Sequence, residues 1–275
     1  MPFPSSGVRA VVTGAGSGLG RAFAVELGKR GARLVVSDID RAAAEETARL
    51  VGASAHAMAC DVAKLADVEA VAREADRVLG GVDLVVNNAG VAVAGRVGEV
   101  AIDDWQWIVG INMWGVIYGC HVFVPKLRAQ KSGHVINVAS AAGLLSPPQM
   151  GPYNVTKAAV VALSETLHAE LAQDGVGVTV LCPTFFRTNI GKSARGADPT
   201  MSSLVEKLMD QGKLQANDVA RIALDAAQKN VLYVVPQSDG AWSWRIKRLM
   251  PESFQSMAPK VIARLSRKAA AARRG

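Results

Sequence analysis

The sequence is poor in the residues that build disulfide frameworks and metal sites. Its 275 residues include three cysteines, Cys60, Cys120 and Cys182, which are odd in number and far apart. They argue against a disulfide framework and favour a reducing, cytoplasmic compartment. The histidines are also few: His56, His121, His134 and His168. None of them stands at ligand spacing from a cysteine, so no metal site is predicted.

Signals for membranes and for extra domains are missing as well. No uninterrupted apolar run reaches membrane-spanning length, and the first residues, Met-Pro-Phe-Pro-Ser-Ser-Gly, lack the basic-then-apolar layout of a signal peptide. Repeats, low-complexity runs and linkers are absent before residue 240. Half of the chain is hydrophobic and a fifth is charged, which allows a large core. We therefore expect one domain over 1–240 and a tail over 241–275.

Excess positive charge is confined to that tail. Residues 241–275 hold nine Lys/Arg and one Glu, whereas the remaining 240 residues hold 22 basic and 23 acidic side chains. The high isoelectric point therefore describes the tail. Because the body has no basic excess and the tail has no known reading motif, no nucleic-acid partner is predicted.

Short apolar runs alternate with helical segments along the domain. The expected strands are 8–13, 31–37, 55–60, 82–86, 133–139, 177–181 and 231–235. The expected helices are 21–30, 41–51, 64–79, about 103–129, a segment that contains Tyr153, and 216–229, with a mixed stretch over 184–213. Such alternation implies parallel strands with crossover helices, and continuously apolar strands imply a sheet covered on both faces. The predicted fold is α/β, a doubly wound seven-stranded parallel sheet.

A glycine-rich turn follows the first strand and opens a helix. Gly14, Gly18 and Gly20 would let backbone N–H groups approach a pyrophosphate, and the helix N-terminus adds partial positive charge. Leu19 stands where the common dinucleotide pattern has glycine. A purely structural glycine turn is the alternative.

Asp38 ends the second strand, about twenty residues after the turn. A carboxylate there can accept both ribose hydroxyls of NAD and would repel the 2′-phosphate of NADP. A helix N-cap at Asp38 or Asp40 is the alternative. Arg41 is close enough in sequence to favour NADP instead.

Tyr153 and Lys157 are four residues apart and share one face of a predicted helix. A nearby ammonium would lower the pKa of the phenol, which could then exchange a proton with an alcohol or carbonyl oxygen. Ser140 follows a predicted strand and could hold the same oxygen. A chance pair of surface neighbours is the alternative, because the spacing alone is a weak signal.

Together these motifs resemble the short-chain dehydrogenase/reductase family. The resemblance rests on Thr13-Gly-Ala-Gly-Ser-Gly-Leu-Gly20, Asn87-Asn-Ala-Gly90, Asn112, Ser140 and Tyr153-x-x-x-Lys157, and covers about 8–235. It implies a Rossmann-like NAD(P)-dependent oxidoreductase.

The resemblance implies a role for each matching residue. Tyr153 would be the general acid/base, Lys157 would lower its pKa and hold the nicotinamide ribose, and Ser140 would bind the substrate oxygen. Asn112 would sit at a helix kink and keep a water beside Lys157. The implied cofactor contacts are Gly14, Ser17, Gly18, Leu19, Gly20, Asp38, Asp61, Val62, Asn88, Ala89, Gly90, Tyr153, Lys157, Pro183 and Thr188. Thr184 departs from the family, which has glycine there.

The expected activity is the NAD-dependent interconversion of a secondary alcohol and a ketone. An apolar substrate, alicyclic, aromatic or steroid-like, is suggested by the candidate pocket residues Leu144, Leu145, Met150, Phe185, Phe186, Met201 and Leu204. Any one of these could instead be ordinary core. An NAD(H)-sensing regulator or scaffold on the same fold is the alternative function. The resemblance also implies a homodimer that pairs through helices near 103–129 and 155–173, or a homotetramer with a second interface near the predicted strand 231–235.

The tail carries an amphipathic pattern. Trp242, Ile246, Leu249 and Met250 form one helical stripe, Pro251 interrupts it, and a second basic amphipathic helix is predicted from 259 onward. We expect the stripe to dock on the body or on a neighbouring subunit, near the substrate entrance. A peripheral contact with an anionic membrane surface and a solvated tail are the alternatives.

Overall fold

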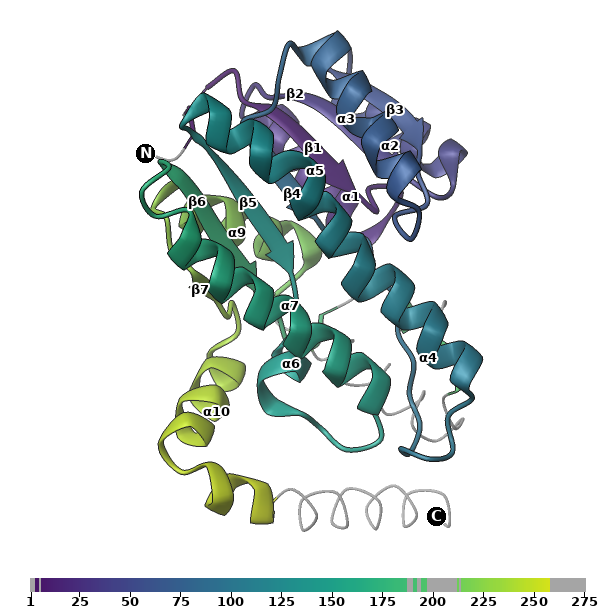
Figure 1. The fold of residues 1–275 in the computed structure, drawn as a ribbon, viewed down its shortest axis with the longest axis vertical. Coiled ribbons are helices and arrows are strands. Elements are labelled where there is room, and N and C mark those ends of the chain that lie inside the picture. Colours follow the sequence, from purple (N-terminus) through teal and green to yellow (C-terminus); the bar gives the residue numbers. More distant parts are fainter. Residues whose placement is uncertain are drawn as a thin grey trace.

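The predicted seven-stranded parallel sheet is confirmed by the computed structural model (Figure 1). The structure describes residues 3–4, 6–186, 190–191, 194–196, 212 and 214–257. The strand order is β3-β2-β1-β4-β5-β6-β7, and every neighbouring pair is parallel. The strands are β1 Arg9–Thr13, β2 Arg33–Asp38, β3 Ala55–Ala59, β4 Leu84–Asn87, β5 Gly133–Val138, β6 Val176–Leu181 and β7 Tyr233–Val234.

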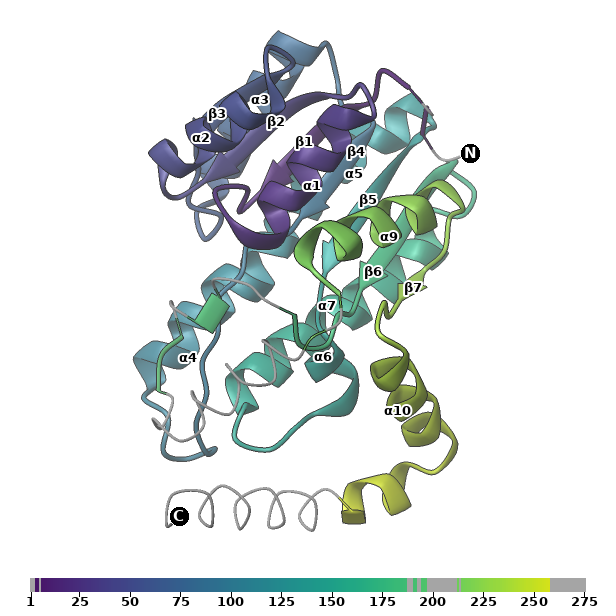
Figure 2. The ribbon, with the colours of Figure 1, turned by 180° about the vertical axis from the view of Figure 1, so that it is seen from behind.

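Helices cover both faces of the sheet, which explains why its inner strands are buried and mostly apolar. In Figure 1, α3 (Leu65–Leu79), α5 (Gly115–Gln130) and α7 (Gly151–Glu170) lie in front of it. Figure 2 shows α1 (Gly18–Lys29) and α9 (Ala216–Gln228) on the opposite face, with α2 (Arg41–Val51) near the β3 edge. One hydrophobic cluster fills each layer.

The long helix expected over about 103–129 is interrupted. It consists of α4 (Ile102–Val109), a π-helical segment η1 (Gly110–Trp114) and α5. The whole stretch Ile102–Gln130 is long and apolar enough to cross a membrane by length and composition alone. Phe123 and Leu127 in α5 are buried against the sheet, so the apolar character is that of a core helix.

Several elements differ from the sequence prediction. Helix α1 begins at Gly18, directly at the glycine turn, and β7 is only two residues long. A short helix, α6 (Ala141–Leu145), follows β5 and was not predicted. After α10 (Ser238–Leu249) the chain is helical again over 251–257, so Pro251 both interrupts one helix and starts the next. The helix predicted from 259 onward lies outside the described residues.

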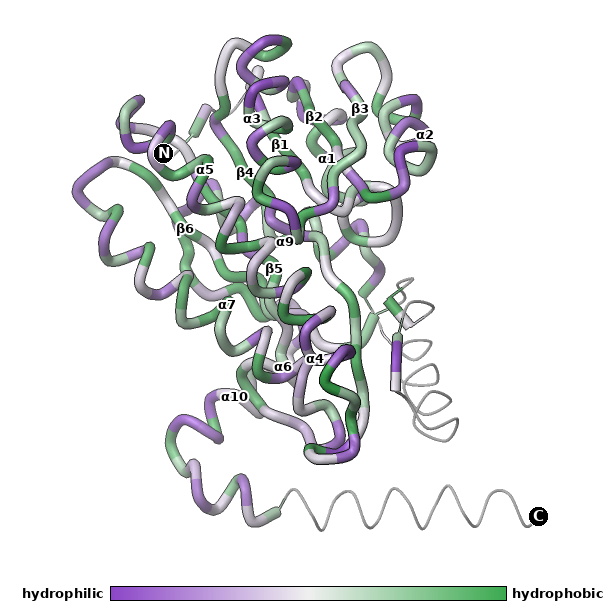
Figure 3. The backbone as a smooth tube through the Cα atoms, turned by 45° about the vertical axis from the view of Figure 1, so that its right-hand side comes forward, coloured by the Kyte–Doolittle hydropathy of each residue, from purple (hydrophilic) through white to green (hydrophobic). Residues whose placement is uncertain are grey.

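Helix α10 packs on α6, but its apolar stripe does not dock on the body of the same chain, so that part of the prediction was wrong. The contacts with the body come from Lys247, whose Nζ donates to the Leu144 carbonyl at 2.7 Å, and from Trp244, whose ring centroid is 4.8 Å from that of Tyr233. The stripe faces outward instead. Figure 3 shows α10 at the end of the molecule away from α2, with hydrophobic and hydrophilic residues mixed along it.

Candidate active site

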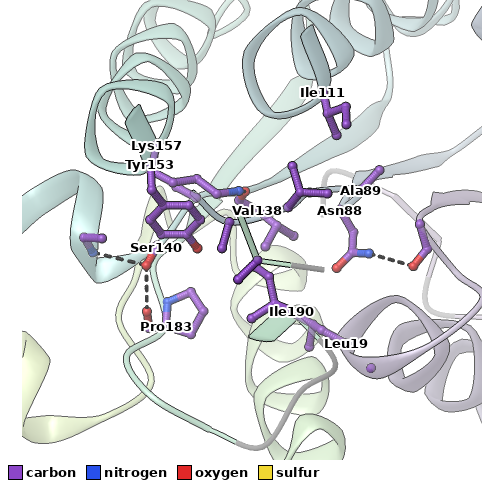
Figure 4. A pocket seen from close by; sticks show the side chains of 18 of the residues that line it. Leu19, Asn88, Ala89, Ile111, Val138, Ser140, Tyr153, Lys157, Pro183 and Ile190 are labelled. Atoms are coloured by element: carbon purple, nitrogen blue, oxygen red, sulfur yellow. Dashed lines mark hydrogen bonds between the residues drawn. The ribbon is translucent and has the colours of Figure 1, made fainter. Parts of the chain in front are cut away.

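A cavity of about 600 Å³ lies at the carboxyl ends of the strands. In doubly wound sheets this edge is where ligands bind, because the loops that leave neighbouring strands diverge there. Figure 4 shows Leu19 and Asn88 on one side of the cavity and Ser140, Tyr153 and Lys157 on the other. The cavity therefore joins the glycine turn to the Tyr/Lys helix.

The glycine turn is shaped for close approach of a ligand to the backbone. Gly14 has φ of 62°, and a Cβ atom there would lie 2.6 Å from Cα of Ala89. Asn88 fixes the turn, because its Nδ2 donates to the carbonyls of Thr13 and Gly14. Gly20 does not line the cavity; its missing Cβ would lie 2.1 Å from the Gly14 carbonyl oxygen, so it serves helix–turn packing.

Helix α1 presents an open N-terminus to the same turn. Ser17 is its N-cap residue, yet its side chain makes no capping hydrogen bond, and the first turn contains no acidic residue. Ser17, Gly18 and Leu19 all line the cavity. Free N–H groups and the positive end of a helix dipole suit a phosphate, so this end of the cavity fits the pyrophosphate of a dinucleotide.

Asp38 lies at the cavity, and the N-cap alternative falls on its neighbour. The Asp40 side chain accepts from the backbone N–H of Ala43 and caps α2. Asp38 accepts from the N–H groups of Gly16, at 2.8 Å, and Asp40. Arg41 forms an ion pair with Glu45 within α2, at 2.9 Å, and does not line the cavity. Among the described lining residues, Lys157 is the only basic one.

The remaining predicted cofactor contacts form the wall between the two ends. Asp61, Val62, Asn88, Ala89 and Gly90 all line the cavity. A Cβ atom on Gly90 would lie 3.4 Å from Nζ of Lys157, so the missing side chain leaves that amine room beside the wall. Pro183 lines the cavity as well, whereas Thr188 lies outside the described residues.

Ser140 is held at the start of α6. Its Oγ accepts from the Ala142 N–H at 3.1 Å and donates to the Pro183 carbonyl at 3.4 Å (Figure 4). Burial raises the pKa of Tyr153, and the nearby Ser140 side chain opposes that rise only in part. The predicted depression of the tyrosine pKa was wrong for the chain alone.

Lys157 does not offset the effect of burial on Tyr153. Its Nζ donates to the Val138 carbonyl at 2.8 Å and lies 5.8 Å from the centroid of the Tyr153 ring. Burial lowers the pKa of Lys157 to about 8. The amine is therefore anchored on the strand end beneath the tyrosine, and the positive charge that would stabilise a phenolate is itself disfavoured by burial.

Asn112 lies in the π-helical segment, so a local break in the α-helix at this residue is confirmed. Both polar atoms of its side chain bond to the backbone of Val91: Oδ1 accepts from the Val91 N–H at 2.8 Å, and Nδ2 donates to the Val91 carbonyl at 2.9 Å. Asn112 is buried and outside the cavity, whereas Val91 lines it. The side chain thus positions the cavity wall, and the relayed water stays a prediction.

The substrate side is apolar. Leu145, Met150, Phe185 and Phe186 line the cavity as expected. Leu144 does not; its side chain is buried in the core behind α6. Met201 and Leu204 lie outside the described residues. Further lining residues, most of them small or apolar, were not predicted from the sequence. They include Val91, Ala92, Ala94, Val138, Ala139, Pro147, Thr184 and Ile190. Only Val138 and Ala139 carried a usable signal, as the end of a predicted strand.

The chain matches one family model and is similar to known oxidoreductases. The model of the family described as short chain dehydrogenase matches residues 9–198. The chain is 32% identical to SadH of Mycobacterium tuberculosis, described as an oxidoreductase, over 93% of this chain and 95% of that protein. It is 33% identical to the oxidoreductase EphD of Mycobacterium bovis over 90% of this chain but only 44% of EphD, so it spans less than half of that relative.

A solved structure gives the same result. A short-chain dehydrogenase/reductase from Burkholderia phymatum in complex with NAD superposes with a TM-score of 0.86 at 37% identity. The alignment covers 91% of this chain and 96% of that one.

Proposed function

Because the chain belongs to the short-chain dehydrogenase family, we propose that it interconverts a secondary alcohol and a ketone with NAD as the hydride carrier. The observation that carries the proposal is the meeting of Ser140, Tyr153 and Lys157 at one end of a cavity whose other end is a phosphate-type turn. A binding module would need the turn but not the buried tyrosine and lysine.

NAD rather than NADP is favoured by the charges at the cavity. Asp38 presents a carboxylate where the adenosine ribose would lie, and Arg41 is paired with Glu45. No described lining residue near Asp38 offers a cation to a 2′-phosphate. NAD would accept or deliver the hydride, while the protein supplies orientation and proton transfer.

Tyr153 is the proposed general acid and base. Since burial raises its pKa, the hydroxyl is protonated at neutral pH and can donate to a ketone oxygen. Ser140 would donate a second hydrogen bond to that oxygen once it releases the weak bond to the Pro183 carbonyl. Lys157 would hold its ammonium below the tyrosine and stabilise the negative charge that develops on the phenol oxygen.

The proposed substrate is an apolar alcohol or ketone, alicyclic, aromatic or steroid-like. The support is the wall of the cavity formed by Leu145, Met150, Phe185 and Phe186, four uncharged apolar side chains. An apolar wall binds hydrophobic skeletons through burial of apolar area and leaves orientation to a few polar atoms.

A screen of secondary alcohols with NAD at alkaline pH, and of the matching ketones with NADH, tests the proposal. NADH absorbance should change with at least one cyclic or aromatic member. NADH binding by calorimetry without turnover on the whole panel would instead support a nucleotide sensor.

A further inference from the structure

Helix α10 turns its apolar stripe away from the protein. The exposed fractions are 63% for Trp242, 44% for Ile246, 82% for Leu249 and 57% for Met250. A surface helix ordinarily buries its apolar side and exposes its charges. In α10 the charged side chain of Lys247 points inward to the Leu144 carbonyl, whereas these four apolar side chains point outward.

The contacts on the body fix this orientation. Successive helical residues are about 100° apart, which puts Gly240, Trp244 and Lys247 on one side of α10 and the stripe on another. Gly240 lies against Thr184, Trp244 against Tyr233, and Lys247 on the end of α6. Rotating the stripe inward would break all three contacts. The stripe is therefore a stable exterior surface.

The charges around the stripe are mixed on α10 itself, where Asp239 precedes it and Glu252 follows it, and the positive excess comes from the chain beyond. Arg245 flanks the stripe, with its guanidinium carbon 5.6 Å from the Trp242 ring, and Arg248 is also exposed. The chain from 258 to 275 then carries six Lys/Arg and no acidic residue. Basic residues beside exposed tryptophan and aliphatic side chains match the interface of an anionic bilayer. A second copy of the chain would bring the same positive charges together, which disfavours self-association here.

We propose that the outer face of α10, formed by Trp242, Arg245, Ile246, Leu249 and Met250, docks on anionic phospholipid bilayers. The apolar side chains enter the acyl boundary, and the arginines together with the basic chain that follows contact the phosphates. The association is peripheral and reversible, because it combines one short helix with screened charge.

Vesicle co-sedimentation of the full chain tests the proposal. Wild type should bind vesicles containing phosphatidylglycerol, bind pure phosphatidylcholine weakly, and be released by high salt. The variant Ile246→Gln/Leu249→Gln/Met250→Gln should bind anionic vesicles with an affinity lowered by at least about tenfold. Changing Lys260, Arg264, Arg267 and Lys268 to Gln should remove most of the salt-sensitive part.

A matched pair of single changes isolates the surface. Leu249→Gln should weaken binding, whereas Leu50→Gln, an exposed leucine of α2 at the other end of the molecule, should not (Figure 1). Unchanged thermal melting of each variant shows that the fold is kept. Absence of wild-type binding to anionic vesicles, or equal binding by the stripe variant, would overturn the proposal. A shift of oligomeric state in the stripe variant without any vesicle binding would assign the surface to a second copy instead.

Discussion

The methyl group of Thr184 packs directly against Gly240. A Cβ atom on Gly240 would lie only 2.3 Å from Cγ2 of Thr184, so the contact leaves no room for a side chain at position 240. Thr184 is the residue that departs from the family's glycine, and its N–H donates to Oε1 of Gln237, just before α10. The threonine that replaces the family's glycine therefore contacts the start of α10. In this chain the strand end beside the cavity is built to receive α10.

This contact predicts the behaviour of Gly240→Ala. The added methyl group must push α10 away from Thr184, and overpacking of this kind costs about 1–3 kcal/mol. We expect a lower melting temperature in calorimetry. Thr184→Gly in the same chain should restore most of the loss, because it removes the clashing methyl group. Equal destabilisation by Gly240→Ala in both backgrounds would contradict the contact.

Turnover should depend on the Tyr153 hydroxyl. Tyr153→Phe removes one oxygen and keeps the ring, so NADH affinity should change little while kcat falls by about 10²–10⁴-fold. Calorimetric NADH titration beside steady-state rates separates the two effects. Wild-type turnover in the Phe variant would remove Tyr153 from the mechanism.

The two directions of the reaction should respond oppositely to pH. The raised pKa of Tyr153 keeps the hydroxyl protonated at neutral pH, which is the form needed to reduce a ketone. Alcohol oxidation needs the deprotonated form, so its kcat/KM should rise toward alkaline pH, while kcat/KM for reduction falls over the same range. Rate profiles in both directions, measured in overlapping buffers, check this. A falling oxidation profile would reverse the assigned protonation state.

The sheet could be predicted from the sequence because local composition alone determines it. Continuously apolar runs such as 133–139 can be buried only in a covered sheet, and the polar turn that follows each one sets its end. Helix α6 has five residues, too few for periodicity to register. The helix break around Asn112 was expected only from the family resemblance, because periodicity alone does not show the inserted residue of a π-helical segment.

The candidate site was predictable where polar residues follow strands, and not where backbone geometry decides. Asp38 and Ser140 end strands and lie at the cavity. The pKa direction of Tyr153 was missed because burial, which depends on the whole fold, outweighs a helical neighbour. The face by which α10 docks was missed because Thr184 and Gly240, far apart in sequence, determine it.

Subunit pairing is predicted through α5 and α7, which cover the same face of the sheet (Figure 1). Trp114, the last residue of η1 before α5, and Val155, on α7, are apolar and exposed. Val155→Arg should place a charge in that contact and shift sedimentation from the assembled form to the monomer. Val231→Arg, beside β7, is the matched change: it should convert a tetramer to a dimer but leave a dimer intact. A wild-type monomer at micromolar concentration would refute the pairing.

Cofactor choice should depend on the charge of Asp38. Asp38→Asn keeps an acceptor for the Gly16 N–H but removes the negative charge, so it should preserve the turn. We expect kcat/KM with NAD to fall about tenfold or more, as for loss of a hydrogen bond to a charged group, and the ratio of NADP to NAD use to rise. Arg41→Ala is the control: because Arg41 pairs with Glu45, its loss should leave the ratio unchanged. Steady-state kinetics with both cofactors decide the matter. A clear NADP preference of the wild type that Arg41→Ala abolishes would transfer the specificity role from Asp38 to Arg41.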